Sequence, residues 1–149
     1  MPRLFTGIEL PPSARDRLAR LKSPLPGAKW VEPANMHITL RFAGDVDNRV
    51  ASEFADALSQ IAIDAFGVRF SALGAFGGND PSVLFAGIEA SPELESLARA
   101  NERAARNAGL PPESRTFKPH VTLARLKHSN AEAIARYLGN RHLVQHGEK

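Results

Sequence analysis

Two short stretches of the chain carry residues that could do chemistry, and the two stretches are nearly alike. Residues 36–42 read MHITLRF and residues 119–125 read PHVTLAR, one in each half of the chain. Each has a histidine, an apolar β-branched residue, a threonine and a leucine, with an arginine close behind. Side chains two residues apart on a β-strand share a face. Two such strands placed side by side would therefore present two imidazoles and two hydroxyls to one cleft.

The paired His-x-Thr pattern suits the hydrolysis of a phosphodiester. With five histidines and four threonines in the chain, two such pairs arise by chance in roughly one percent of shuffled sequences. The reaction needs a base that takes a proton from water and an acid that protonates the departing oxygen, each worth about 10²–10⁴ in rate. His37 and His120 are the candidates for these roles. The hydroxyls of Thr39 and Thr122 can donate to the non-bridging phosphate oxygens, where charge builds up.

A metal site is the weaker alternative. Each motif pairs histidine with threonine and holds no carboxylate, whereas zinc sites draw on histidine, cysteine and carboxylate ligands. The chain has no cysteine, which excludes disulfides, thiol nucleophiles and cysteine-bound metal or iron–sulfur centres. We therefore expect chemistry without a metal.

Composition sets the class of protein. With 149 residues, 43% of them apolar, the chain is long enough for one globular domain. A net charge of +3, with arginine more frequent than lysine, is compatible with a phosphate-bearing partner, because the guanidinium group can bond two phosphate oxygens at once. No apolar signal segment or membrane-spanning run is present, which predicts a soluble, cytoplasmic protein.

Strands and helices alternate around the two motifs. The patterns predict strands at 3–10, 36–42, 66–73, 83–88 and 121–125, and a short extended piece at 29–31. They predict helices at 13–21, 47–61, 91–108 and 130–138, a turn-rich loop at 74–81 and an unstructured tail at 139–149. Asp47 and Ser91 are predicted helix caps, and Gly109 a helix end. No glycine-rich phosphate loop follows a strand. The order predicts a duplicated α+β unit with antiparallel sheets rather than a doubly wound parallel sheet.

The doubled His-x-Thr-Leu motif resembles the signature of the 2H phosphoesterases, and specifically of the RNA 2′,3′-cyclic phosphodiesterases, also called 2′-5′ RNA ligases. The resemblance covers residues 1 to about 127. Besides the motifs, it rests on the segments 3–11, Trp30-Val31, 74–76, 109–111 and 117–120. It implies one domain over 1–149, with two pseudo-symmetric lobes of antiparallel sheet and flanking helices around a central cleft.

The resemblance also implies the roles of the motif residues. His37 would protonate the leaving 3′ oxygen, and His120 would accept a proton from water. Thr39 and Thr122 would bind the phosphate, without a cofactor. The implied product is an RNA or nucleotide ending in a 2′-phosphate, and a 5′ hydroxyl in place of water would give 2′-5′ ligation. No obligate protein partner or membrane is implied.

Four further positions are candidate substrate contacts with an open alternative. Phe42 matches a family position that stacks on a base. Strict alternation, however, places Phe42 on the other face of the strand from His37, where core packing is an equal alternative. Arg125 matches a substrate-side arginine, although alternation places it across the strand from His120 unless a bulge intervenes. Arg41 and Lys118 are either phosphate contacts or solvated charges. His128, His142 and His146 receive no role.

The C-terminal end departs from the family pattern. Relatives continue past the last helix with a further pair of strands, which residues 141–149 do not supply. The lobe would then be covered otherwise, or pair an exposed edge with another molecule, or lose activity. Two other functions therefore stay open: a non-catalytic RNA-binding module, and an esterase on small cyclic nucleotides or ADP-ribose cyclic phosphate.

Overall fold

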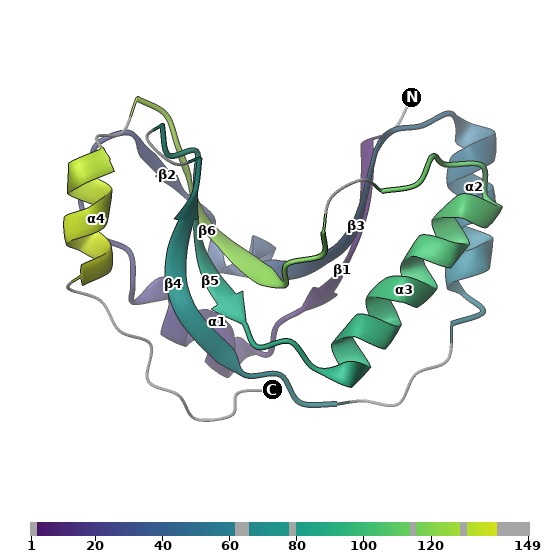
Figure 1. Cartoon of the computed structure of the whole chain (residues 1–149), viewed down its shortest axis with the longest axis horizontal. Coiled ribbons are helices and arrows are strands. Elements are labelled where there is room, and N and C mark those ends of the chain that lie inside the picture. The colour runs from purple at the N-terminus through teal and green to yellow at the C-terminus, as the bar shows by residue number, and fades with distance from the viewer. Residues whose placement is uncertain (1–2, 62–65, 78–79, 114–115, 129–130, 140–149) are drawn as a thin grey trace. The chain divides into compact units, whose positions relative to one another are not determined.

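The computed structural model describes residues 3–61, 66–77, 80–113, 116–128 and 131–139 (Figure 1). The chain forms two compact units, and it passes between them several times, so the units are not its N- and C-terminal halves. Unit 1 comprises Met1–Ile8, Thr39–Phe66 and Ala90–Lys118, and unit 2 comprises Glu9–Ile38, Gly67–Glu89 and Pro119–Lys149. Strand β3 (His37–Asp45) contributes its first two residues to unit 2 and the others to unit 1.

Among its described residues, unit 1 contains two strands and two helices. Strand β1 (Arg3–Glu9) lies beside β3, and helix α3 (Pro92–Asn107) runs beside helix α2 (Asn48–Leu58) (Figure 1). The core between the helices is built around Phe54 from α2, which packs against three buried alanines of the α3 segment. Apolar residues that recur at helical spacing bury one face of each helix in this way.

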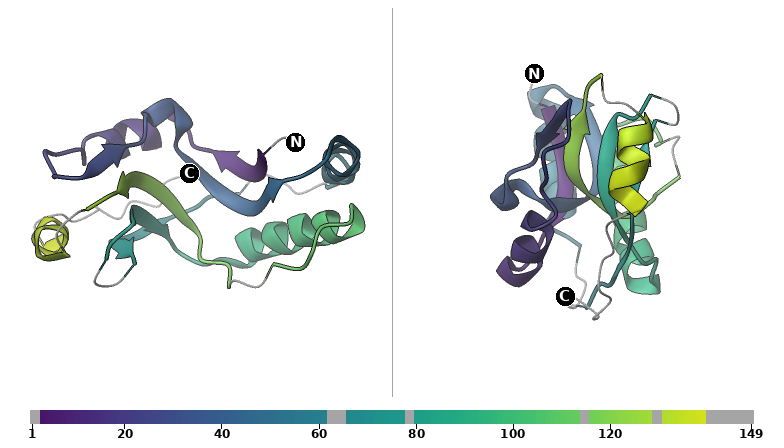
Figure 2. Two further views of the ribbon diagram at one scale, coloured as in Figure 1. Left: turned by 90° about the horizontal axis from the view of Figure 1, so that it is seen from above. Right: turned by 90° about the vertical axis from the view of Figure 1, so that its left-hand side faces the viewer.

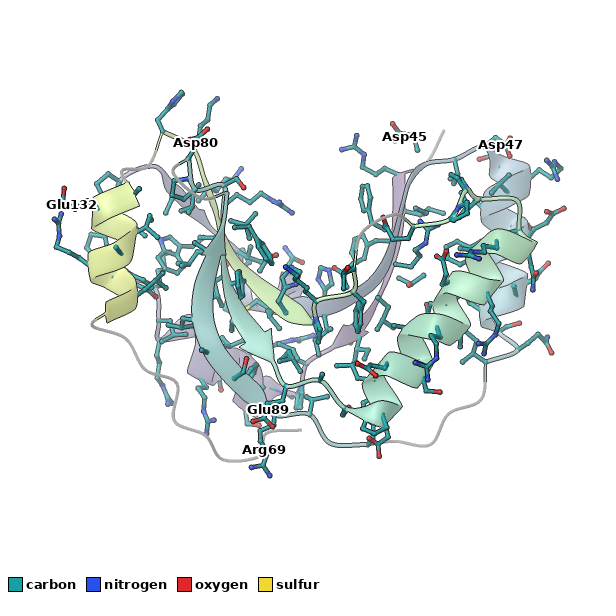
Figure 3. The ribbon with its side chains drawn as sticks, in the orientation of Figure 1. Asp45, Asp47, Arg69, Asp80, Glu89 and Glu132 are labelled. Atoms are coloured by element: carbon teal, nitrogen blue, oxygen red, sulfur yellow. The ribbon has the colours of Figure 1, made fainter. Side chains whose placement is uncertain are left out.

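Local side-chain chemistry fixes where these two helices begin and end. The carboxylate of Asp47 (Figure 3) accepts a hydrogen bond of 2.8 Å from the amide of Val50 at the start of α2. The hydroxyl of Ser91 accepts one of 3.2 Å from the amide of Leu94. Beyond α3, Gly109 has a φ of 102°, which favours glycine. Both predicted caps and the predicted helix end are confirmed.

Unit 2 is an antiparallel sheet with helices. Its elements are α1 (Pro12–Ala19), β2 (Ala28–Trp30), the 3₁₀ turn η1 (Pro33–Asn35), the start of β3, β4 (Phe70–Phe76), β5 (Val83–Ile88), β6 (His120–Leu126) and α4 (Ala131–Gly139). Strand β5 lies between β4 and β6, while β2 and the start of β3 pair with the other edge of β6 (Figures 1 and 2). The predicted α+β class with antiparallel strands is confirmed.

The unit 2 sheet has one covered face and one face that carries the motif residues. Ile38 and Val121 pair across β3 and β6, and both are fully buried on the covered face. Tyr137 of α4 contacts Trp30 on this face, with ring centroids 6.0 Å apart, and its hydroxyl donates to the carbonyl of Leu21. We call the opposite face, which carries His37, His120 and Thr122, the histidine face.

A backbone hydrogen bond and an ion pair both join the strands at one end of the β4–β5 pair. The amide of Glu89 donates to the carbonyl of Arg69, and the two side chains form an ion pair of 3.8 Å (Figure 3). Both side chains are more than half exposed. Such an exposed pair contributes at most about 1 kcal/mol, so the strand pairing itself holds the hairpin.

Several sequence predictions about element bounds are wrong. The strand predicted at 66–73 lies at Phe70–Phe76, so Gly74, Ala75 and Phe76 belong to a strand and not to a loop. Their backbone pairs with β5, and this pairing outweighs the local turn preference of glycine. Strand β3 continues three residues beyond the predicted end at Phe42.

Three further sequence predictions concern the start of helix α1, the C-terminal tail and membrane-spanning segments. Helix α1 begins one residue before Ser13, and no side chain caps it. The predicted tail lies, after Gly139, outside the described residues, as do His142 and His146. Within the described residues, no helix is both long and apolar enough to cross a membrane.

Candidate active site

The two motif histidines lie on neighbouring strands and on one face. The pairing of Ile38 with Val121 sets the register, so His37 stands opposite Thr122, and His120 is the next residue along on the same face. Diagonal neighbours of this kind are about 7–8 Å apart. Both histidine side chains are partly exposed. The expectation that the two motif strands lie side by side is confirmed.

His37 is oriented by the backbone that precedes its strand. Its Nδ1 lies 2.8 Å from the carbonyl oxygen of Asn35, in the 3₁₀ turn. A carbonyl oxygen only accepts hydrogen bonds, so Nδ1 carries the proton in this contact. Nε2 is then the nitrogen through which His37 can exchange a proton with a ligand.

His120 is oriented by two aromatic rings. Phe76 and Phe85 stack on each other with centroids 4.3 Å apart, and each meets the imidazole of His120 at its edge, at 5.1 and 5.6 Å. Gly74 leaves room for this arrangement, since a Cβ at Gly74 would lie 2.6 Å from the ring of Phe85. The sequence prediction did not assign these residues to the site, although 74–76 was among the segments of family resemblance.

A bulge in β6 brings Arg125 to the histidine face. Along β5, Phe85 pairs with Thr122 but Leu84 pairs with Ala124, so β6 has one extra residue at this point. Leu123 and Ala124 are accordingly both buried, and the alternation resumes with Arg125 exposed. A bulge re-aims the side chains beyond it. Arg125 therefore lies on the same face as His120. Strict alternation had placed it on the other face, and the exception that we allowed for a bulge is the one that the structure shows.

Two predicted residues lie in the unit 1 part of β3. Thr39 is partly exposed and follows His37 by two residues, on the same side of the strand. Phe42 is 43% exposed. Phe42 therefore does not pack in the core, and the core alternative for it is wrong. Its stacking on a base stays a prediction.

Arg41 is buried, and its side chain is bonded within unit 1. Nε donates to the carboxylate of Glu102 at 2.6 Å, Nη1 to the carbonyl of Phe42 at 2.7 Å and Nη2 to that of Pro111 at 2.5 Å. Only 7% of the residue is exposed. All three guanidinium nitrogens are thus engaged, and this geometry argues against the predicted phosphate contact. Arg41 joins β3, α3 and the 110–113 segment.

Glu102 is the centre of this network. It accepts hydrogen bonds from Arg41, from Arg106 at 2.8 Å and from the amide of Glu113 at 3.0 Å. Burial raises the pKa of this carboxyl group. Its hydrogen bonds from the Glu113 amide and the two guanidinium groups outweigh burial and lower the pKa of Glu102 to about 2. The carboxylate is therefore ionised at neutral pH and holds Arg41 in place.

The remaining charged candidates lie at the surface. Lys118 is exposed and belongs to unit 1, so its predicted phosphate contact stays a prediction. His128 is exposed beyond β6 and has a φ of 57°. Among the described residues, no group of three or more histidine, cysteine or carboxylate side chains is arranged to hold a metal ion.

Sequence comparison places the chain among known proteins. Residues 10–145 match the model of the 2′-5′ RNA ligase superfamily. A curated protein of Aeropyrum pernix, named RNA 2′,3′-cyclic phosphodiesterase, is 39% identical over 127 residues, which are 83% of this chain and 70% of that protein. A protein of the same name from Aquifex aeolicus is 32% identical over 98% of this chain and 82% of its own length.

Comparison with solved structures also finds proteins that are similar to this chain. The crystal structure of TT0787 of Thermus thermophilus matches with a TM-score of 0.79 and 27% identity, over 98% of this chain and 81% of that one. E. coli LigT in complex with 3′-AMP matches with a TM-score of 0.71 and 26% identity, over 86% of this chain and 74% of that one. The fold around the two motif strands is thus similar to that of solved proteins over most of the chain.

Proposed function

The chain belongs to the 2′-5′ RNA ligase superfamily, and from that membership and the histidine face we propose that it hydrolyses RNA or nucleotide 2′,3′-cyclic phosphate ends to 2′-phosphates. Relatives from several bacteria and archaea are named RNA 2′,3′-cyclic phosphodiesterase. One observation carries the proposal for this chain. His37 and His120 stand diagonally on one face of adjoining strands, in a register set by Ile38 and Val121.

The proposed reaction moves one proton at each histidine. His120 takes a proton from water as the water oxygen attacks phosphorus, and His37 gives a proton from Nε2 to the departing 3′ oxygen. The bond between phosphorus and the 3′ oxygen breaks, and the product carries a 3′ hydroxyl and a 2′-phosphate. The family resemblance supports this order of the two histidines. Exchange with solvent then restores both starting protonation states.

The contacts of each histidine support its role. The hydrogen bond between Nδ1 of His37 and the Asn35 carbonyl orients the ring and directs Nε2 to the ligand. Phe76 and Phe85 each make a T-shaped contact with the His120 ring and so restrict its orientation. A catalytic group that is already oriented loses less freedom in the transition state. Two preset imidazoles therefore suit general acid–base catalysis.

The phosphate itself would be bound by hydroxyl groups. Thr122 lies opposite His37 and two residues after His120, and Thr39 has the same relation to His37 on its own strand. A threonine hydroxyl aimed at a non-bridging oxygen stabilises the charge that develops there. Arg125, on the same face, adds a positive charge at the edge of this site. No metal is needed in this scheme.

The same steps with a different nucleophile would give 2′-5′ ligation. A 5′ hydroxyl takes the place of water, attacks the cyclic phosphate, and gives its proton to His120 while His37 protonates the 3′ oxygen. No further catalytic group is required, because the nucleophile is an oxygen in both cases. The balance between hydrolysis and ligation then depends on the concentration of RNA 5′ ends.

The direct test uses RNA that ends in a 2′,3′-cyclic phosphate, in buffer with a chelator. We expect a product with a 2′-phosphate, and a loss of about 10²–10⁴ in kcat for His37→Ala and for His120→Ala. His128→Asn is the matched control, because it removes a histidine outside the proposed site and asparagine tolerates the positive φ at this position.

Three outcomes would contradict the proposal. Binding of the RNA without turnover would indicate a non-catalytic RNA-binding module. Turnover of small cyclic nucleotides alone would indicate an esterase on such compounds. Full activity in either alanine variant would exclude that histidine from the chemistry.

A further inference from the structure

A pair of positively charged side chains lies on the histidine face, beyond Thr122. Arg125 of β6 pairs in register with Lys29 of β2. Residues directly opposed on antiparallel strands point to the same face, about 4.5–5.5 Å apart at Cβ. Since the bulge places Arg125 on the histidine face, Lys29 lies on that face too. The sequence patterns had not singled out Lys29.

The neighbours of Lys29 confirm its direction. Trp30 pairs with the buried Ala124 and contacts Tyr137 of α4, so it lies on the covered face. Ala28 pairs with the buried Leu126 on that same side. Lys29 stands between these two residues, so its side chain points the other way, and it is exposed.

The charges of this pair are not balanced by an acidic side chain within the part of the chain that the structure describes. Among those residues, neither Lys29 nor Arg125 makes an ion pair within 4 Å of a carboxylate. Like charges directly opposed across two strands are destabilising. Lys127, also exposed, follows at the end of β6, where its amide bonds to the carbonyl of Gly27. A polyanionic ligand would offset this repulsion.

The position of the pair fits a nucleotide beyond the reacting one. Lys29 and His37 both lie along the edge of β6 that is opposite β5. Arg125 pairs with Val83 and Thr122 pairs with Phe85, two residues apart on β5, so Arg125 lies about 7 Å beyond Thr122 along the sheet. A phosphate held between His37 and Thr122 is therefore out of direct contact with the backbone at Lys29.

We propose that Lys29 binds the backbone phosphate that precedes the cyclic end, so that the protein favours oligonucleotides over mononucleotides. This inference rests on the proposed function of the same face. A lysine binds phosphate as a point charge and reads no base. The preference therefore concerns the length of the RNA and not its sequence.

The experiment compares two substrates that share one reacting end. One is uridine 2′,3′-cyclic phosphate, and the other is a tetranucleotide that ends in the same cyclic uridine. KM and kcat are measured for the wild type and for Lys29→Gln at several salt concentrations. Lys29→Arg keeps the charge. Arg136→Gln removes a charge from the exposed surface of α4, the helix whose Tyr137 packs on the covered face of the sheet.

In Lys29→Gln, the ratio of the KM for the tetranucleotide to the KM for the mononucleotide should rise about 2- to 5-fold, as for the loss of an exposed ion pair. The slope of log KM for the tetranucleotide against log salt should fall by roughly 0.7, as for one lost contact to single-stranded RNA. Lys29→Arg should restore both values, and Arg136→Gln should change neither. An unchanged ratio and slope in Lys29→Gln would overturn the inference.

A binding measurement separates this inference from the proposed function. The probe is the same tetranucleotide with a 2′-phosphate end, labelled for fluorescence anisotropy. If the wild type hydrolyses neither substrate but Lys29→Gln weakens binding and lowers its salt slope, the phosphate contact stands and the enzymatic proposal fails. If hydrolysis occurs and Lys29→Gln binds the probe like the wild type, the enzymatic proposal stands and the contact at Lys29 is refuted.

Discussion

At the scale of single residues, Thr122 has the most informative position. It stands opposite His37 on the neighbouring strand, and it shares a strand and a face with His120. It also pairs with Phe85, whose ring meets His120. A hydroxyl in this place can reach a phosphate that lies between the two imidazoles. The alternative is that the Thr122 side chain only packs within the sheet. Substitution distinguishes packing from a hydrogen bond to the phosphate.

We predict that Thr122→Val lowers kcat by about 10²–10³, because it removes one donor to the oxygen on which charge develops. Valine keeps the shape and the β-branch, so the free energy of unfolding should change little. Thr122→Ser keeps the hydroxyl and should retain most of the activity. Steady-state kinetics with the cyclic-phosphate RNA measure the effect, and equal activities of the valine and serine variants would refute the role of the hydroxyl.

Residue types and local spacing predicted part of this site. The two His-x-Thr pairs are visible in the sequence because a strand alternates its faces every two residues. Arg125 was placed only conditionally, because its face depends on a bulge that arises from the pairing of β6 with β5. Arg41 was misjudged for a similar reason. Its partner Glu102 is 61 positions away in the sequence, and no local pattern connects the two.

At the scale of elements, the β4–β5 hairpin supports His120. Gly74 pairs with Phe85, and the ring of Phe85 stacks on that of Phe76, two residues beyond Gly74 on β4. The closest approach of a Cβ at Gly74 would be to the far end of the Phe85 ring. The ring would therefore have to move, and the edge contact with His120 would move with it.

We predict that Gly74→Ala reduces kcat more than it reduces stability. The displaced Phe85 ring no longer holds the imidazole of His120, and a misplaced catalytic group can cost up to about 10²-fold in rate. Gly139→Ala is the matched control, since a Cβ at Gly139 meets no atom of the described residues within 4 Å. The pH–rate profile should change together with kcat in Gly74→Ala. A profile and kcat like those of the wild type would show that the ring does not position His120.

Unit 1 offers a comparison of two arginines that bond to one carboxylate. The side chain of Arg41 is 7% exposed and that of Arg106 is 56% exposed, and both donate to Glu102. We predict that Arg41→Ala lowers the free energy of unfolding by about 3–5 kcal/mol, because it leaves buried acceptors without a donor. Arg106→Ala should cost at most about 1 kcal/mol. Denaturant unfolding measures both, and equal costs would contradict a structural role for Arg41.

The sequence predicted the caps of the unit 1 helices better than the position of strand β4 in unit 2. Asp47, Ser91 and Gly109 act within one turn of their own helix, so their effect is visible locally. Strand β4 was displaced in the prediction because the glycine of residues 74–76 suggested a turn. Its true position is set by pairing with β5, which brings together residues that the local pattern does not relate.

At the scale of the whole molecule, stability in acid should depend on Glu102. Its pKa in the folded protein is about 2, below the value of about 4.3 expected in the unfolded chain. A carboxyl group whose pKa is lower in the folded protein stabilises the fold fully at pH values above its pKa in the unfolded chain. This stabilisation is lost as the pH falls towards the pKa in the folded protein. The carboxylate therefore stabilises the protein fully above about pH 5, and progressively less between about pH 4.3 and 2.

We predict that Glu102→Gln is less stable than the wild type at pH 7, and that the difference becomes smaller at pH 3. Urea unfolding at the two pH values measures this change. Glu132→Gln, which removes an exposed carboxylate of α4, should have little effect at either pH. A difference between Glu102→Gln and the wild type that stays constant from pH 7 to pH 3 would refute the assignment.

The histidine face also belongs to the whole molecule, because the chain brings two distant segments together to form it. The 3₁₀ turn before β3 orients His37, and the β4–β5 hairpin orients His120. Acid–base catalysis by such a pair requires one neutral imidazole and one protonated imidazole at the same time. The activity should therefore fall on both sides of an optimum pH.

The pH dependence of kcat/KM for hydrolysis of the cyclic-phosphate RNA tests this pairing most directly. The wild type should give a bell-shaped profile, in which the limb at low pH reports the base His120 and the limb at high pH reports the acid His37. The residual activity of His120→Ala should lack the first limb, and that of His37→Ala the second. A monotonic wild-type profile, or two alanine variants that keep both limbs, would contradict the pairing of His37 and His120 as acid and base.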